Sequence, residues 1–264
     1  MTVREAPLKR TLPAFAEAVR RPVTLLFLRD WLITILVIMV YFLLRGQAGW
    51  DTGLAFRVTT RLIEFEQATN TFWEPAIQQA SIRLHWVQET ANFIYAYMHF
   101  PVLGAVGLWL WFRGRDRFVF MRNTMFISMV FGILFYYLVP AAPPRLLEGN
   151  GVDLGFVDTV FGGNTSVSYA QPSFILNEYA AIPSFHFGWI ALASACIWVN
   201  TRSWTLRIVA FALSLLMSWA IVASANHFFI DMALGGLVVA VSWHIARKLE
   251  RRQQARASRP SLAA

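Results

Sequence analysis

Long apolar stretches, almost free of charged side chains, recur along this chain of 264 residues. A run of about 17–25 predominantly apolar residues can cross a bilayer as an α-helix. The chain as a whole is 57% hydrophobic and 14% charged, whereas an ordinary soluble domain carries about 25% charged residues. The sequence therefore predicts an all-α, polytopic membrane protein.

We expect these stretches to form a six-transmembrane-helix bundle. Small residues within them, such as Gly132 and Ala193, let transmembrane helices approach closely and favour tight packing. The expected spans are residues 31–44 (with an alternative start near Val23), 92–112, 119–140, 184–200, 206–225 and 229–246.

The positions of the basic residues predict the orientation of the bundle. The net charge is +8, and lysine and arginine concentrate in the N-terminal segment, in the turns after the second and fourth spans, and in the C-terminal tail. Six spans place these four segments on one side, which the positive-inside rule identifies as the cytoplasm. We therefore expect both termini in the cytoplasm and the protein in the cell membrane. Because the charge is a topology signal, we expect no nucleic-acid partner.

The predicted organisation has three parts. Residues 1–22 form a basic cytoplasmic segment, residues 23–246 the membrane domain, and residues 247–264 a basic, flexible cytoplasmic tail. The membrane domain carries two long outer loops, at 45–91 and 141–182. The arginines of these outer loops are Arg45, Arg57, Arg61, Arg83 and Arg145.

The two outer loops differ in pattern. Apolar residues of the first loop recur at helical spacing at Leu54, Val58, Leu62 and Phe65. Such an amphipathic pattern suits helices that lie in the membrane interface, or helices that pack on the outer end of the bundle. The second loop is rich in Gly, Asn, Ser and Pro and has no periodicity, which is typical of a lid or a binding loop.

The single cysteine, Cys196, excludes an internal disulfide. The chain has no cysteine pair or Cys/His cluster of the kind that holds structural zinc. We expect no metal and no cofactor.

The most informative polar residues are His227 and Asp231, placed where the last apolar stretch begins. Positions i and i+4 of a helix share one face, so the two side chains can touch. An aspartate that accepts a hydrogen bond from one ring nitrogen fixes the imidazole tautomer and raises the basicity of the other nitrogen. The pair therefore suits a nucleophilic or proton-transferring histidine.

Two further polar residues fall on the same predicted outer side. Arg145 follows the third span and His186 begins the fourth. Helix ends on one side of a bundle can converge, so we expect these residues to share one site with His227 and Asp231. We assign the other histidines, His85, His99 and His244, to structure, and the aromatic residues at span ends, Tyr95 and Tyr136 among them, to interface belts.

These residues resemble the signatures of the PAP2 phosphatase and phosphotransferase superfamily, which are K-x6-R-P, P-S-G-H and S-R-x5-H-x3-D. Arg145 matches the arginine of the first signature. The stretch from Pro183 to His186 is similar to the second, and that from His227 to Asp231 to the end of the third. The amino-acid sequence from Asn177 to Trp189 resembles that of the inositolphosphotransferase branch. This branch is related to fungal inositol phosphorylceramide synthases and to actinobacterial PAP2 proteins.

The chain departs from the signatures at three positions. Leu138 stands where the first has its lysine, Phe185 where the second has its glycine, and Ile221 where the third has its arginine. The phosphotransferase-like branch also tends to depart at the last of these. Two phosphate-binding cations are thus absent, and a phosphoryl dianion needs compensation from other charges or from backbone amides. Arg61 and Arg83 of the first outer loop are candidates to replace them.

The resemblance implies a mechanism. His227 would attack phosphorus and form a phosphohistidine, which Asp231 orients and stabilises, while His186 would protonate the leaving alkoxide and then deprotonate the acceptor. Arg145, Ser184 and Asn226 would bind the phosphate.

The resemblance also implies a substrate. The donor would be a lipid-borne phosphate at the outer surface, and the acceptor water or a hydroxyl such as that of inositol, a sugar or a lipid alcohol. The alternative is a non-catalytic PAP2-like transporter or scaffold, because two cations are missing. A transporter would be expected to place polar residues near the bilayer midplane, whereas the spans here are apolar at their centres.

Overall fold

The computed structural model describes residues 11–49, 51–148, 151–162, 165–167, 172 and 174–257. Residues 1–10 of the predicted N-terminal segment and residues 258–264 of the predicted tail lie outside this range. The structure divides into two compact units, residues 1–40 and residues 41–264. Every contact described below lies within the second unit.

The described residues form helices joined by turns and loops. The elements are α1 (Thr11–Gly46), α2 (Thr52–Ala68), α3 (Glu74–Ile82), α4 (His85–Phe93), the π-helical turn η2 (Ile94–Met98), α5 (His99–Arg113), α6 (Arg115–Leu138), the 3₁₀ turn η3 (Pro144–Leu146), α7 (Phe185–Asn200), α8 (Trp204–Ala223) and α9 (Phe229–Ala257). Among the described residues no strand occurs, and an isolated bridge joins Ala141 to Ala180.

The lengths and compositions of these helices are those of a polytopic membrane protein. Five stretches are long and apolar enough to cross a bilayer: Val23–Gly46, His85–Arg113, Arg115–Leu138, Trp204–Ala223 and Phe229–Ala257. They correspond to five of the six predicted spans, the first with its alternative start. The sixth, α7, is apolar but shorter, so a six-span topology stays a prediction.

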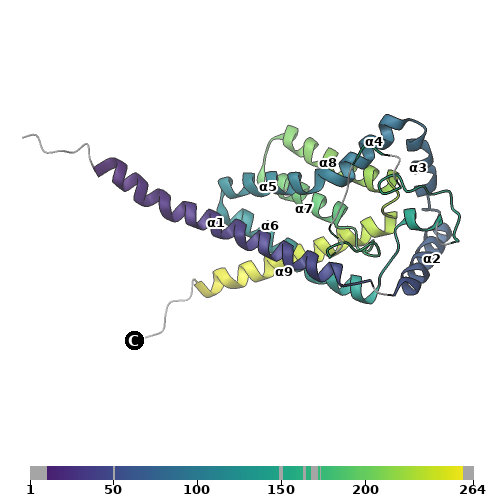
Figure 1. The fold of residues 1–264 in the computed structure, drawn as a ribbon. Helices are drawn as coiled ribbons and strands as arrows, with labels where there is room; N and C mark the ends of the chain where they lie inside the picture. Colours follow the sequence, from purple (N-terminus) through teal and green to yellow (C-terminus); the bar gives the residue numbers. More distant parts are fainter. Residues whose placement is uncertain are drawn as a thin grey trace, which may run out of the picture. The chain divides into compact units, whose positions relative to one another are not determined.

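Helix α7 is central to the packing of the second unit. It contacts α8, α9 and α5, and α6 packs on α9 and α5 (Figure 1). Large apolar side chains of α8, such as Ile208, Phe211 and Leu215, are exposed. An apolar outer surface on a helical bundle is what a lipid environment requires, since lipid tails cannot satisfy exposed polar groups.

Two glycines let α7 and α9 approach closely. A Cβ at Gly235 would overlap the backbone oxygen of Ser184, and a Cβ at Gly188 would lie 2.9 Å from the backbone oxygen of Gly235. This approach allows the amide of Ser184 to donate to the backbone oxygen of Asp231 at 3.0 Å. The two helix starts that carry His186 and Asp231 are therefore held together by backbone contact.

Phe185, which replaces the glycine of the second signature, is a core residue. Its ring stacks on Trp189 with centroids 4.8 Å apart. Trp189 in turn donates a hydrogen bond to Ser128 of α6 at 2.9 Å. The ring of Phe185 fills the space in front of Gly132, where any side chain would overlap it. The larger residue on α7 is thus accommodated by the absence of a side chain on α6.

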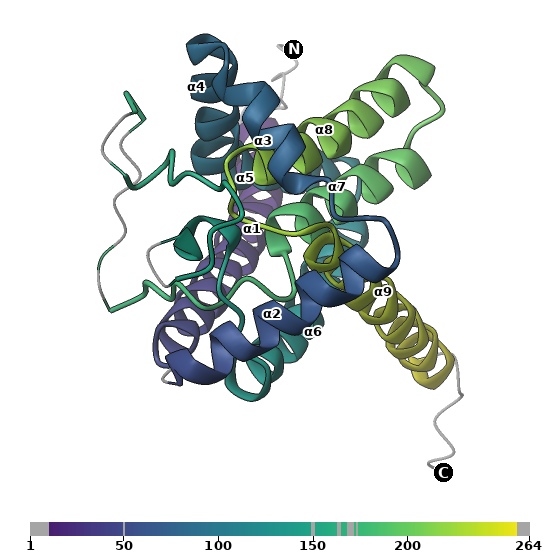
Figure 2. The same ribbon diagram turned by 90° about the vertical axis from the view of Figure 1, so that its right-hand side faces the viewer.

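The first outer loop is mostly helical and lies at one end of the bundle. Figure 2 shows α2, α3 and α4 in front of the ends of the other helices, and α3 and α4 contact α8. The buried face of α2 consists of Ala55, Thr59, Ile63 and Glu66. Each of these residues directly follows a residue of the predicted apolar stripe. Packing on the bundle end is therefore present, whereas location in a membrane interface stays a prediction.

Helix α9 extends past its predicted end at residue 246 to Ala257. Arg247 pairs with Glu250 at 3.0 Å and lies 4.4 Å from the centre of the Phe120 ring. Contacts of this kind support a helix beyond its apolar part. The first part of the segment expected to form a flexible tail is therefore helical.

The close approach of α7 and α9 makes a testable prediction. Gly235→Ala should lower the Tm of the purified protein by several degrees, because the added methyl group meets backbone and not a movable side chain. Gly104→Ala on α5 is the matched control, since no atom lies within 4 Å of its added Cβ. An equal Tm for both variants would contradict the packing described here.

Candidate active site

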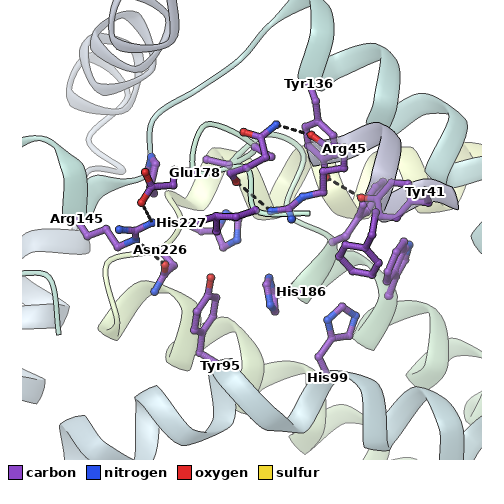
Figure 3. A pocket seen from close by; sticks show the side chains of 18 of the residues that line it. Tyr41, Arg45, Tyr95, His99, Tyr136, Arg145, Glu178, His186, Asn226 and His227 are labelled. Carbon is purple, nitrogen blue, oxygen red and sulfur yellow. Dashed lines mark hydrogen bonds and ion pairs between the residues drawn. The ribbon is translucent and has the colours of Figure 1, made fainter. Parts of the chain in front are cut away.

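A cavity opens between the end of α1, the start of α5, the start of α7 and the connection between α8 and α9 (Figure 3). Its volume is about 90 Å³, whereas one water molecule needs about 10–15 Å³ on the same scale. It therefore has room for a small polar group. Its polar lining includes Arg45, His99, Arg145, His186, Asn226 and His227.

His227 lies in the connection between α8 and α9, and its ring contacts the carboxylate of Asp231. Its Nδ1 lies 3.3 Å from Oδ2 of Asp231, and the same oxygen accepts the amide of Phe228 at 2.9 Å. Asp231 is fully buried. Because a carboxylate accepts, it assigns the ring proton to Nδ1 and leaves Nε2 of His227 for chemistry. The predicted His–Asp contact is present.

His186 lies in the first turn of α7 and faces His227 across the cavity. The two ring centroids are 5.8 Å apart. Two other rings contact His186: Tyr95 at 4.6 Å and His99 at 5.0 Å between centroids. The structure therefore brings the two histidines singled out in the sequence into one site.

His99, Tyr95 and Tyr136 also line this cavity, which the sequence did not indicate. The sequence predicts a structural role for His99 and places in interface belts for the two tyrosines. All three are at least nine-tenths buried. The π-helical turn η2 directly precedes His99, and such turns change the face that a helix presents and often occur at functional sites. Regular helical spacing therefore does not predict that Tyr95 and His99 face the cavity.

Arg145 lies in η3 and is surrounded by acceptors. Its Nε donates to Oδ1 of Asn226 at 3.2 Å, while its terminal nitrogens pair with Asp158 at 3.1 Å and Glu178 at 3.5 Å. Its guanidinium also stacks 4.2 Å from the centre of the Phe161 ring. Arg145 is thus fixed in the cavity wall, and Asn226 contacts it directly.

The loop that carries Asp158 and Phe161 is anchored to the outer helices. Gln78 of α3 exchanges two hydrogen bonds with the backbone of Val157, at 2.7 and 3.0 Å. Asn92 donates to the backbone oxygen of Thr159 at 2.7 Å. The described part of the second outer loop is therefore positioned by the first one.

Comparison with known proteins identifies the family of the chain. A sequence model of the PAP2 superfamily matches residues 60–246, which include His186, His227 and Asp231. The chain belongs to the PAP2 superfamily. Comparison with curated proteins and with solved structures finds no significant match.

Two of the three cations in the superfamily signatures have no equivalent at the same positions. Leu138 is 70% exposed at the end of α6, and Ile221 is fully buried in the core. Neither lines the cavity, and neither do Arg61 and Arg83, whose side chains are exposed. The structure therefore does not bring either candidate replacement into the site, because α2 and the α3–α4 turn direct Arg61 and Arg83 outward.

Ser184 lies beside the candidate site and contacts α9. It is fully buried, it does not line the cavity, and its amide is bonded to the backbone oxygen of Asp231. Its contact with α9 positions the start of α7. Direct binding of phosphate by Ser184 stays a prediction.

Two buried glutamates that are not among the predicted site residues hold the start of α9. Oε1 of Glu66 accepts the amide of Ile230, and Oε1 of Glu74 accepts the amide of Phe229, both at 2.8 Å. The first amides of a helix have no partner within the helix and favour negative charge. Glu66 lies on the buried face of α2 at helical spacing from Ala55, Thr59 and Ile63, and that spacing is the signal that could have identified it.

These two carboxyl groups interact, and their pKa values rise. Burial and then the neighbouring charge of Glu74 raise the pKa of Glu66 to about 8, and Asp231 adds to the effect. Burial also raises the pKa of Glu74. We infer that the pair holds a proton at neutral pH, which prevents repulsion between two buried charges.

A pH dependence of stability follows. Because the pKa of folded Glu66 lies above its ordinary value of 4.5, the contribution of this group to the free energy of unfolding falls as pH rises from about 4.5 to about 8. The Tm should therefore be lower at about pH 9 than at about pH 6, and Glu66→Gln should reduce that difference. Glu64→Gln, an exposed position on the same helix, is the control. An unchanged pH dependence in Glu66→Gln would refute the shared proton.

Proposed function

We propose that this protein is a membrane-embedded lipid phosphate phosphatase or phosphotransferase that acts through a phosphohistidine at His227. The observation that carries the proposal is the shared cavity. His227, with Nδ1 engaged by Asp231, faces His186 across a space that Arg145 also lines. Membership of the PAP2 superfamily supports phosphatase-type chemistry on lipid phosphates.

The proposed reaction has two steps. In the first, Nε2 of His227 forms a bond to phosphorus, the bond from phosphorus to the lipid oxygen breaks, and His186 gives that oxygen a proton. Asp231 stabilises the imidazolium that forms. In the second step, His186 removes a proton from water or from an alcohol, whose oxygen attacks phosphorus and releases His227.

The proposed setting is the outer face of the cell membrane. Basic residues follow α5 and α7 at the end opposite to the cavity, which supports cytoplasmic termini under the positive-inside rule. The donor is then a lipid-borne phosphate in the outer leaflet. The resemblance of the residues around His186 to the inositolphosphotransferase branch supports a hydroxyl such as that of inositol as an acceptor beside water.

The first test gives the purified protein a panel of lipids labelled in the phosphate, with and without free inositol. Wild type should release or transfer label, and His227→Ala should lose activity by at least about a hundredfold. His85→Ala, an exposed histidine outside the cavity, should match wild type. Label found as free phosphate indicates hydrolysis, and label found on inositol indicates transfer. Equal turnover by His227→Ala would exclude the mechanism.

A second test traps the intermediate. Brief exposure of wild type to labelled substrate should place label on the protein in a form that is stable to base and labile to acid, as a phosphoramidate is. His227→Ala should take up none. Label that appears on another residue of wild type would assign the nucleophile elsewhere.

A third test removes divalent ions. Because a covalent histidine intermediate needs no metal-activated water, turnover should be the same with and without an excess of chelator. Activity that disappears with chelator and returns with one added divalent ion would contradict the proposed chemistry.

A further inference from the structure

The proposed site has a deficit of positive charge. A phosphoryl group is a dianion, and two of the three signature cations are replaced by apolar residues, Leu138 and Ile221. Arg145 remains, but Asp158 and Glu178 already pair with it. Under the proposed function, a second cation must therefore come from outside the signatures.

We propose that Arg45, at the end of α1, is this second phosphate-binding cation. This inference rests on the proposed function. Arg45 lines the same cavity as Arg145, His186 and His227. It precedes the region that the superfamily model matches, which begins at residue 60. The signatures therefore gave no reason to expect it.

The partners of Arg45 leave its charge available. Its terminal nitrogens donate to the backbone oxygens of Asn177 at 3.2 Å and Ile175 at 3.5 Å. Among the described residues it makes no ion pair, in contrast to Arg145. A guanidinium has five N–H donors, and the two carbonyls and the hydroxyl of Tyr136 occupy at most three of them, so donors remain for an anion.

The position of Arg45 is fixed by the fold. The side-chain amide of Asn177 donates to the backbone oxygens of Arg45 at 2.9 Å and Ala48 at 3.1 Å. Gly49 then turns the chain at φ +82°, and a Cβ there would lie 2.8 Å from Oδ1 of Asn177. Arg45 also lies 5.9 Å from the centres of the Phe42 and Tyr136 rings. The guanidinium is thus held in place before any ligand arrives.

The two arginines reach the cavity from different sides. Figure 3 shows Arg45 and Arg145 directed toward the region of His227 from opposite directions, with His186 facing the same region. A phosphoryl group bound there would have a guanidinium on each side. Such an arrangement compensates two negative charges and leaves the line of attack by His227 open.

The experiment measures binding of inorganic phosphate, and separately turnover of a lipid phosphate, by wild type and variants in detergent. Arg45→Gln should weaken phosphate binding by about 10- to 100-fold, the range expected for the loss of charge-assisted hydrogen bonds. Turnover should show a matching fall in kcat/KM. Arg61→Gln removes the same charge from an exposed position on α2 and should leave both unchanged.

Arg45→Lys separates anion binding from a purely structural role. Lysine keeps the charge but cannot reproduce the fork that donates to the carbonyls of Ile175 and Asn177. Anion binding predicts that Arg45→Lys retains more phosphate affinity than Arg45→Gln, whereas a structural role predicts equal losses and an equal fall in Tm. Equal losses would overturn the proposal.

A measurement on the unaltered protein covers the case in which Arg45→Gln does not fold. Phosphate should protect Arg45 from an arginine-selective dicarbonyl reagent, as read from the modified peptides, and should not protect Arg61. Absence of protection would overturn the proposal.

The outcomes separate this inference from the proposed function. If wild type turns over lipid phosphate and Arg45→Gln equals it, the inference alone fails. If phosphate binds through Arg45 but no lipid phosphate is turned over, the anion site stands and the proposed function fails. If wild type neither binds nor turns over phosphate, both fail.

Discussion

The start of α9 depends on three buried carboxyl groups, and the rest of the site depends on the start of α9. Asp231 accepts the amide of Phe228, Glu74 that of Phe229 and Glu66 that of Ile230. These carboxyl oxygens accept hydrogen bonds from backbone amides at the helix start, which have no partner within the helix. The contacts of Glu66 and Glu74 join α2 and α3 to the first residues of α9, the helix whose Asp231 holds the ring of His227.

Charge in the cavity is distributed unevenly. Arg145 is matched by two carboxylates, whereas Arg45 has backbone carbonyls as its partners. Fixed donors in a cavity of the protein act more strongly on an anion than the same donors in water. The residues that supply this field come from segments far apart in sequence, at the end of α1 and in η3. A short sequence signature therefore cannot identify a charged residue that a distant helix contributes to the cavity.

The sequence predicted the apolar helices and the convergence of His186, His227, Asp231 and Arg145, because span length and helix-end topology follow from local composition. It did not predict Arg45, His99 or Glu66. Arg45 looked like one of several loop arginines, since its role depends on the loop around Asn177 folding back onto α1. His99 follows a π-helical turn, and Glu66 acquires its partner only when α9 is in place. The roles of Arg45 and Glu66 depend on contacts between segments far apart in sequence, which local patterns do not show.

The contact between Phe185 and Gly132 has a consequence for how this sequence can change over time. The ring occupies the volume that a side chain at Gly132 would need. A return to glycine at position 185 would open a void beside Trp189, and a larger residue at position 132 could be accepted only after that return. The two positions are therefore expected to vary together among related chains, so that a phenylalanine in the second signature is inherited with a glycine on the preceding transmembrane helix.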